Sequence, residues 1–275
     1  MTSASIIPLP TAHEGASAVP GLRESTRRIV RQKVALAIPT FCEADNLPVL
    51  LDRVRGILDR LDLDYEILIV DDDSCDGTTE IVSAIAQKDP RVRLLVRKGQ
   101  RGLSGAILHG WENTDADIMG VMDADFQHPP ELLAELTDAI ASGCDLVIGS
   151  RYTRGGALGE WQAFRKLLSA AAVWATWPIQ RVGLRAKDPM SGFFFIRRDC
   201  LEGIAFQQTG FKLLLEILVR ARISSVREIP FAFGQRYRGA SKANVRVAID
   251  YGRLLARLYR SRFGFSRVVP DGAFD

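Results

Sequence analysis

Acidic side chains directly follow two of the short apolar runs in this sequence. A triple Asp at 71–73 comes after the run 66–70, and Asp123 and Asp125 come after the run 118–122. In open α/β sheets, ligands bind at the edge formed by the carboxyl ends of the strands. Carboxylates gathered at one edge repel one another unless a cation holds them, so this arrangement predicts a divalent metal site.

The second acidic stretch carries three side chains with oxygen ligands at alternate positions: Asp123, Asp125 and Gln127. Because side chains alternate in extended backbone, these three point the same way. Hard oxygen ligands suit Mg²⁺ or Mn²⁺, which usually completes its shell with phosphate oxygens. We therefore predict that these three residues hold the metal. An arginine, Arg151, follows a further apolar run, 146–148, and is expected at the same edge.

Some of these polar residues also fit a purely structural role. Acids at strand ends cap helices, and for Asp76 and Thr78 that structural alternative is as good as a functional one. The chain contains no GxGxxG, GxxxxGK[ST], HExxH or GxSxG motif, so dinucleotide binding, a P-loop and these hydrolase sites have no support. The three His do not cluster, and the four Cys form no CxxC pair, which indicates reduced cytosolic thiols.

Short Val, Ile and Leu runs alternate with helix-like stretches along residues 33–150. The runs cover 34–38, 66–70, 91–96, 118–122 and 146–148, and the helical stretches cover 44–60, 76–88, 103–113 and 129–142. This alternation predicts an α/β fold with a mostly parallel sheet covered by helices on both faces. Further on we expect strands at 193–196 and 226–233 and helices at 160–182, 211–223 and 245–263.

Charge is unevenly distributed along the 275 residues. The net charge is +3, but residues 236–267 hold nine Lys or Arg and one acid, Asp250, which is 9 − 1 = +8 and leaves 3 − 8 = −5 elsewhere. The imbalance indicates an anionic ligand or surface near the C-terminal end. No recognised nucleic-acid module is present, so we do not expect nucleic acid as the partner.

Two amphipathic segments suggest contact with a membrane surface. The predicted helix 245–263 is basic on one face, and the predicted helix 160–182 holds Trp161, Trp174 and Trp177. Both helices would equally suit packing on the sheet with a solvated Arg face. No run of 18 apolar residues and no signal pattern occur, so we expect a cytoplasmic protein that binds the cytoplasmic face of a membrane peripherally.

Seven motifs in this order resemble the family 2 glycosyltransferases of GT-A fold, and more narrowly the polyprenyl-phosphate (dolichol-phosphate) mannose synthases. They span roughly residues 33–260: Ile38-Pro-Thr-Phe-Cys-Glu43, Val70-Asp-Asp-Asp-Ser-Cys-Asp-Gly-Thr78, Gly102-Leu-Ser-Gly-Ala with His109-Gly, Met122-Asp-Ala-Asp-Phe-Gln-His128, Gly149-Ser-Arg-Tyr152, Asp188-Pro-Met-Ser-Gly-Phe-Phe194 and Phe233-Gly-Gln-Arg-Tyr-Arg-Gly-Ala-Ser-Lys242. The resemblance implies a nucleotide-diphospho-sugar transferase fold. We expect a catalytic domain at 33–235 and a basic segment at 236–275 within the same domain. Residues 1–32 are rich in Ser, Thr, Ala, Gly and Pro without apolar periodicity, which predicts a mobile arm.

The resemblance also implies roles for single residues. Asp123, Ala124 and Asp125 would meet the sugar nucleotide, and the base and ribose would be lined by Pro39, Phe41, Glu43, Val70 and Asp72. Arg151, Arg236 and Lys242 would contact phosphates or the donor. Arg151 and Arg165 would meet the acceptor phosphate. Asp125, Arg236 and Lys242 are the expected catalytic residues, acting with Mg²⁺ or Mn²⁺.

The implied reaction is an inverting transfer of mannose from GDP-mannose to a lipid-linked phosphate, at a membrane and with a separate membrane subunit as a possible partner. The family usually has Tyr-Asn where this chain has Phe41-Cys42, which leaves a UDP-glucose or other donor as an alternative. A catalytically silent scaffold is the alternative from another class. A processive polysaccharide synthase is disfavoured, since there is no Gln-x-x-Arg-Trp motif.

Overall fold

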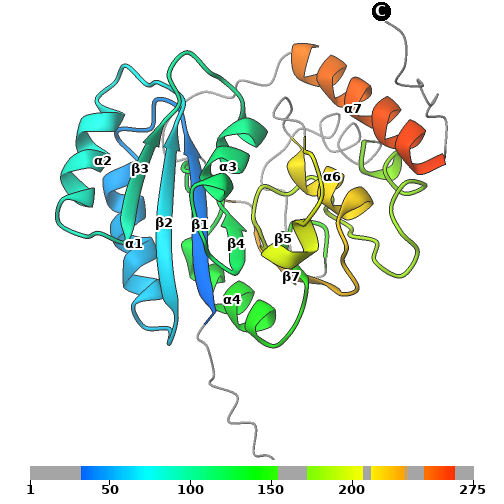
Figure 1. The fold of residues 1–275 in the computed structure, drawn as a ribbon, viewed down its shortest axis with the longest axis horizontal. Helices are drawn as coiled ribbons and strands as arrows, with labels where there is room; N and C mark the ends of the chain where they lie inside the picture. The colour runs from blue at the N-terminus through cyan, green and yellow to red at the C-terminus, as the bar shows by residue number, and fades with distance from the viewer. Residues whose placement is uncertain (1–31, 154–171, 207–211, 233, 235–244, 264–275) are drawn as a thin grey trace, which may run out of the picture. The chain divides into compact units, whose positions relative to one another are not determined.

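The computed structural model describes residues 32–153, 172–206, 212–232, 234 and 245–263 of the chain (Figure 1). The arm expected at the N-terminus, up to residue 31, and the first part of the helix expected at 160–182, with Trp161, therefore lie outside the described residues.

Seven strands form one sheet in the order β3-β2-β1-β4-β6-β5-β7. Strand β6 pairs antiparallel with β4 and β5, and the other four pairings are parallel, which confirms the expected mostly parallel sheet. Each expected run became a strand, with bounds β1 Lys33–Thr40, β2 Asp64–Asp71, β3 Val92–Val96, β4 Ile118–Val121, β5 Leu146–Ser150, β6 Phe194–Arg197 and β7 Val226–Pro230.

Helices cover both faces of this sheet, as expected. One core packs α1, α2 and α4 against the sheet, and the other packs α3 and α6 on the opposite face. The helices are α1 Leu47–Leu58, α2 Thr78–Ala86, α3 Leu103–Glu112, α4 Leu133–Ala141, α6 Leu213–Arg220 and α7 Val245–Phe263, with short 3₁₀ turns η1 Pro130–Leu132 and η2 Arg198–Leu201.

Strand β1 shows why the sequence makes a two-sided sheet. Its alternate residues enter different cores: Val34, Leu36 and Ile38 pack under α1, whereas Ala35 and Ala37 pack under α3. The small side chains let α3 lie close at Gly110, where a Cβ would come within 3.0 Å of Val70 Cγ2. Close packing of α3 keeps the loop before it, residues 97–102, at the carboxyl edge of the sheet.

The predicted helix at 160–182 is wrong at its C-terminal end. Residues 172–174 are helical, but the chain turns from 175 to 179. Pro178 disfavours helical backbone at the residue before it, which ends the helix here. The Thr176 hydroxyl donates to the Val173 carbonyl at 2.7 Å and is buried in the turn.

Helix α7 has the predicted bounds, and its apolar side packs inside the protein. Leu254 and Leu258 lie against Leu215 and Val219 of α6 and against Ile179 (Figure 1). The Tyr259 hydroxyl donates to the Ala175 carbonyl at 2.8 Å, which joins α7 to the 172–179 turn. Arg253 on the other side is exposed. Among the described residues, no helix is long and apolar enough to cross a membrane.

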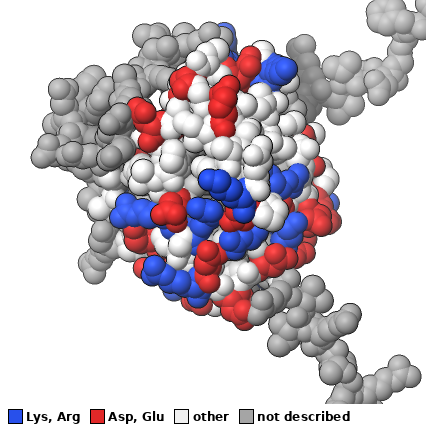
Figure 2. Space-filling model, turned by 90° about the vertical axis from the view of Figure 1, so that its left-hand side faces the viewer, with Lys and Arg blue, Asp and Glu red and all other residues white. Residues whose placement is uncertain are grey.

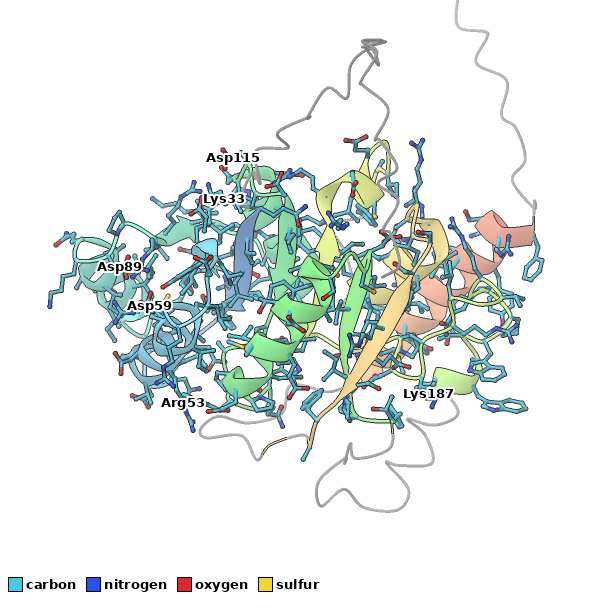
Figure 3. The ribbon with its side chains drawn as sticks, turned by 90° about the horizontal axis from the view of Figure 1, so that it is seen from below. Lys33, Arg53, Asp59, Asp89, Asp115 and Lys187 are labelled. Atoms are coloured by element: carbon cyan, nitrogen blue, oxygen red, sulfur yellow. The ribbon has the colours of Figure 1, made fainter. Side chains whose placement is uncertain are left out.

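The face over α2 and β3 carries intermingled charges of both signs, as Figure 2 shows, so its described residues form no basic patch. At its lower edge Asp59 and Asp89 lie together, and Lys33 lies beside Asp115 (Figure 3). Arg91 joins the two acids: its Nη1 donates to Asp59 at 2.6 Å and its Nη2 donates to Asp89 at 2.8 Å. These ion pairs stabilise the loop between α2 and β3.

The Asp89 carboxylate predicts a loss of stability in acid. Hydrogen bonds from Arg91 lower the pKa of Asp89 from 3.8 to about 2, although burial opposes the shift. A depressed pKa in the folded state stabilises the protein above pH 4, and that stability is lost as the pH falls towards 2. We expect Asp89→Asn to lower the free energy of unfolding at pH 7 by about 2 kcal/mol. Urea titrations should show a much smaller difference at pH 2, and the exposed Asp138→Asn is the control.

Candidate active site

The loops at the carboxyl ends of β1, β2 and β4 meet at one edge of the sheet, as predicted. Backbone N–H groups of the first loop reach the second: Cys42 donates to Ser74 Oγ at 2.8 Å, and Ala44 donates to an Asp76 carboxylate oxygen at 3.1 Å. Cys42 has a φ of 59°, a left-handed conformation that is uncommon outside Gly and Asn. The two loops therefore form one connected rim above the sheet.

Two of the acids at and beyond the end of β2 are structural. Asp71 is fully buried and accepts hydrogen bonds from the Thr40 and Ser74 hydroxyls at 3.1 and 2.6 Å. Asp76 accepts from the Thr78 hydroxyl at 2.6 Å and from the Thr78 N–H at 3.2 Å. These bonds place Asp76 against Thr78, the first residue of α2, whose N-cap residue is Gly77 and receives no side-chain hydrogen bond.

Asp72 differs from both of these acids. Its Oδ2 accepts from the Gly102 N–H at 2.8 Å, but its buried Oδ1 has no hydrogen-bond partner among the described residues. Arg97 Nη1 lies 3.3 Å from Oδ1 while donating to the Gly102 carbonyl. Burial raises the pKa of Asp72, opposed by the Gly102 hydrogen bond and by Arg97. A buried acceptor without a donor is costly, so this oxygen is suited to a ligand N–H.

Phe41 lies at the same rim beneath an arginine that the sequence did not single out. The Arg101 guanidinium carbon is 4.1 Å from the centre of the Phe41 ring. Arg101 Nη2 also donates to the Asp73 carbonyl at 3.3 Å, which orients the guanidinium. Arg101 carried no sequence signal because it is an exposed Arg in a loop, and only the fold brings it to Phe41.

The loop after β4 holds the three predicted metal ligands in a compact turn. The expected extended backbone is wrong here, because residues 124–128 bend and Phe126 has a φ of 63°. The Asp123 N–H donates to His128 Nδ1 at 3.0 Å, which closes the loop, and the Gln127 N–H donates to Asp125 Oδ1 at 3.1 Å. His128 is buried and stacks on Phe193 with 5.1 Å between ring centres. Burial lowers the pKa of His128 to about 4, so the ring is neutral at pH 7 and Nδ1 accepts.

The carboxylates of this loop suit a cation completed by a ligand. Within the described part of the chain, no three His, Cys, Asp or Glu side chains gather closely enough to form a metal cage. Asp123, Asp125 and Gln127 supply two carboxylates and an amide. Mg²⁺ and Mn²⁺ are commonly bound by one or two carboxylates together with substrate phosphates. The donor set therefore fits a metal–diphosphate complex better than a metal held by protein alone.

Arg151 is fixed by a buried acid. Asp188 accepts from its Nε and Nη2, both at 2.8 Å, and from its backbone N–H at 3.0 Å. Asp188 is itself fully buried. Burial disfavours the charged form of Arg151, but the hydrogen bonds to Asp188 and the charge of Asp188 favour it. The pKa of Arg151 is therefore raised. This bidentate pair holds a permanent positive charge near Asp123.

Lys212, just before α6, belongs to the same neighbourhood and was missed from the sequence. Burial lowers its pKa, as does the charge of Arg151, whereas Asp123 and Asp188 oppose the shift. These four side chains come from segments far apart along the chain. No sequence pattern linked Lys212 to them, so only the tertiary structure could identify it.

The other predicted site residues lie in three settings. Pro39, Val70 and Ala124 are buried, and the Val70 side chain packs in the core beneath α3. Glu43 accepts from the Asn46 side chain at 2.6 Å at the start of α1, beside the rim. Arg165, Arg236 and Lys242 lie outside the described residues.

A cavity of about 540 Å³ lies away from these acids, between α3 and the segment after β6. Leu108, Trp111, Met119, Leu201 and Phe206 are among its lining residues. None of the predicted site residues that the structure describes lines it, and its described walls lack a cluster of carboxylates that could hold a cation. The cavity is therefore separate from the predicted site residues that the structure describes.

Comparison with known proteins identifies the family of this chain. The family described as "Glycosyl transferase family 2" matches residues 35–205. A dolichol-phosphate mannosyltransferase of Pyrococcus furiosus is 41% identical over 241 residues, which are 86% of this chain and 66% of that protein. The chain thus spans just under two thirds of that relative. The Saccharomyces cerevisiae dolichol-phosphate mannosyltransferase is 33% identical over 86% of this chain and 90% of its own length.

A third relative, polyprenol monophosphomannose synthase of Mycolicibacterium smegmatis, is 35% identical over 84% of this chain and 91% of its own length. Among solved structures, mannosyl-3-phosphoglycerate synthase of Rubrobacter xylanophilus has a TM-score of 0.61 at 19% identity, covering 88% of this chain and 79% of its own.

Glucosyl-3-phosphoglycerate synthase of Mycobacterium tuberculosis has a TM-score of 0.60 at 19% identity, covering 86% and 82%, and was crystallised with Mn²⁺ and UDP. These likenesses confirm the GT-A fold. The chain belongs to glycosyl transferase family 2, in the group that contains the dolichol-phosphate and polyprenol-phosphate mannosyltransferases.

Proposed function

We propose that this protein transfers mannose from GDP-mannose to a polyprenyl phosphate and inverts the anomeric carbon. The observation that carries the proposal is the meeting, at one sheet edge, of Asp72, whose buried Oδ1 pairs with Arg97 but accepts no hydrogen bond among the described residues, with the loop that holds Asp123 and Asp125. The relatives named above act on lipid-linked phosphates, which supports the acceptor class.

The donor would lie across the β1, β2 and β4 loops. Its base would meet Asp72 beside Phe41, because a base N–H can satisfy the buried Oδ1. Its diphosphate would face Asp123, Asp125 and Gln127, which would hold Mg²⁺ or Mn²⁺. When bound, that cation supplies positive charge against the diphosphate. Guanine and uracil both offer a ring N–H, so the choice of GDP rests on the resemblance of the motifs to the polyprenyl-phosphate mannose synthases.

The acceptor needs little help as a nucleophile. A phosphate monoester is largely dianionic at pH 7 because its second pKa is about 6. One of its oxygens attacks the anomeric carbon from the face opposite the diphosphate, and the bond to the leaving oxygen breaks with its electron pair. The nucleoside diphosphate leaves, which inverts the configuration. Arg236 and Lys242 would neutralise the charge on the leaving group, and Arg151 and Arg165 would hold the acceptor phosphate.

Chain connectivity supports a role for Arg236 in this site. The Gly234 N–H donates to the Gln127 carbonyl at 3.0 Å, so residue 234 touches the metal-binding loop after β4. Arg236 follows two residues later in the sequence, which supports the role that the resemblance assigns to it.

We also propose that the segment 172–182, which includes the turn 175–179, and α7 rest on a membrane surface. Trp174 is 79% exposed, Val182 83% and Phe263 54%, although large apolar side chains are usually buried. The Tyr259–Ala175 hydrogen bond joins the two segments that carry them. Exposed aromatics beside Arg260 and Arg262 suit an anionic lipid interface. The apolar side of α7 is occupied inside the protein, so the contact would use these exposed groups.

A flotation assay tests this membrane contact. The protein should float with vesicles that contain anionic lipid, and Trp174→Ser with Trp177→Ser should reduce the floated fraction severalfold. Val49→Ser is the matched control, since Val49 is an exposed apolar residue on α1. Equal flotation of the double variant and the control would contradict the proposed surface. So would a failure of the parent protein to float with vesicles that contain anionic lipid and with vesicles that lack it.

A thermal-shift panel tests the donor. With Mn²⁺ present, GDP at about 100 times its Kd should stabilise the protein by about 2.7 kcal/mol, which raises Tm by several degrees, and UDP and dTDP should do less. A selective response to UDP would favour a UDP-sugar donor. No response to any nucleotide would favour the silent scaffold instead.

A further inference from the structure

Two glycines from distant segments press against the loop Asp123–His128, here called the metal loop. Gly192 lies in the segment before β6, and Gly234 follows β7. Neither has a φ in the left-handed region, so backbone conformation does not require glycine at these positions. The lack of space requires glycine at both positions, because a side chain at either one would meet the metal loop.

Gly192 backs the carboxylate of Asp123. A Cβ at this position would lie 3.2 Å from both Asp123 carboxylate oxygens and 3.3 Å from His128 Cε1. His128 is held by its stacking on Phe193 and cannot easily yield. The Asp123 carboxylate would therefore have to move by a few tenths of an ångström.

Gly234 contacts the metal loop from another side. A Cβ there would lie 2.8 Å from the Phe126 carbonyl oxygen, which is backbone and must shift as a whole. Phe126 already has a φ of 63°, a rare conformation for a bulky residue. The Gly234 N–H holds the Gln127 carbonyl at 3.0 Å, and the Gln127 N–H in turn holds Asp125 Oδ1 at 3.1 Å.

We propose that Gly192 and Gly234 are positioning residues that set the Asp123 and Asp125 carboxylates for the cation. The inference rests on the proposed function, since it assumes that these carboxylates bind a metal–nucleotide complex. Gly192 limits where the Asp123 carboxylate can lie. Gly234 holds Gln127 by its carbonyl, and the N–H of Gln127 holds the Asp125 carboxylate.

Mn²⁺ binding to the full chain, measured by electron paramagnetic resonance with and without GDP, tests the proposal. Gly192→Ala and Gly234→Ala should each raise the apparent Kd for Mn²⁺ by about tenfold, as loss of supporting contacts around metal ligands usually does. Gly56→Ala is the matched control, because a Cβ on this α1 glycine meets nothing within 4 Å. Circular dichroism should show the same folded content in all of these proteins.

The outcomes distinguish a failure of the positioning role from a failure of the proposed function. If the parent and Gly56→Ala bind neither Mn²⁺ nor GDP, the proposed function fails. If they bind and both glycine variants bind equally well, the positioning role fails. Hydrogen–deuterium exchange on the parent needs no variant: Mn²⁺ with GDP should slow exchange at Gln127 and Gly234 together. Unchanged exchange at Gly234 would also overturn the proposal.

Discussion

Replacing Asp125 should abolish transfer while the protein stays folded. Asp125 Oδ1 accepts the Gln127 N–H at 3.1 Å, so an Asn at this position can keep that loop bond through its carbonyl oxygen. It cannot keep the negative charge that the cation needs. We expect Asp125→Asn to lower kcat by about a thousandfold and Asp125→Ala by at least as much.

The measurement is product formation under saturating donor, with Asp138→Asn of α4 as an exposed acid that carries no proposed role. The parent and both Asp125 variants should unfold within a few degrees of each other. Turnover of Asp125→Asn within tenfold of the parent would show that this carboxylate does not bind the metal.

The second large effect is expected at Asp72. In Asp72→Asn the side-chain carbonyl can still accept from Gly102, but an NH₂ group would then replace the buried acceptor Oδ1. That NH₂ would leave a base N–H without an acceptor, and it would also remove the charge that pairs with Arg97 Nη1, 3.3 Å from Oδ1. We expect the Kd for GDP to rise about 10- to 100-fold, as loss of a charged hydrogen bond implies.

Isothermal titration of GDP in the presence of Mn²⁺ measures this loss, and the neighbouring Asp73→Asn is the control. Asp73 Oδ2 accepts from the Gly99 N–H at 3.2 Å, so its carboxylate is occupied within the loop. An unchanged Kd in Asp72→Asn would place the base elsewhere.

The sheet could be predicted because most strands, such as β1 and β5, contain a short, nearly continuous apolar run. Buried parallel strands need apolar side chains on both faces, and β1 and β2 are buried along nearly their whole length. The carboxyl edge followed directly from that prediction, and with it the placement of Asp72, Asp123 and Asp125. For residues that directly follow a strand, the position in the sequence was therefore enough to predict that they lie at the site.

Residues that reach the site from elsewhere could not be found in this way. Arg101, His128 and Lys212 contribute through a cation–π contact, a closing hydrogen bond and proximity to Arg151. Each depends on a segment packed next to the loop in space. The motif predicted that Val70 lines the base, but the Val70 side chain packs in the core beneath α3.

At the turn 175–179, the local effect of a proline outweighs the helical spacing of apolar residues. Apolar spacing over 160–182 favoured one long helix, but Pro178 and the buried Thr176 hydroxyl end it at 174. Breaking the helix leaves Trp174 and Trp177 exposed beside α7.

Transfer of mannose from a guanine nucleotide to a lipid phosphate is tested most directly by mass spectrometry of the lipid fraction. The full chain is incubated with Mn²⁺, GDP-mannose and a short polyprenyl phosphate. We expect one hexose added per lipid phosphate and an equal amount of GDP released. GDP-mannose left intact and a lipid free of mannose, while UDP-glucose is consumed, would contradict the proposed reaction.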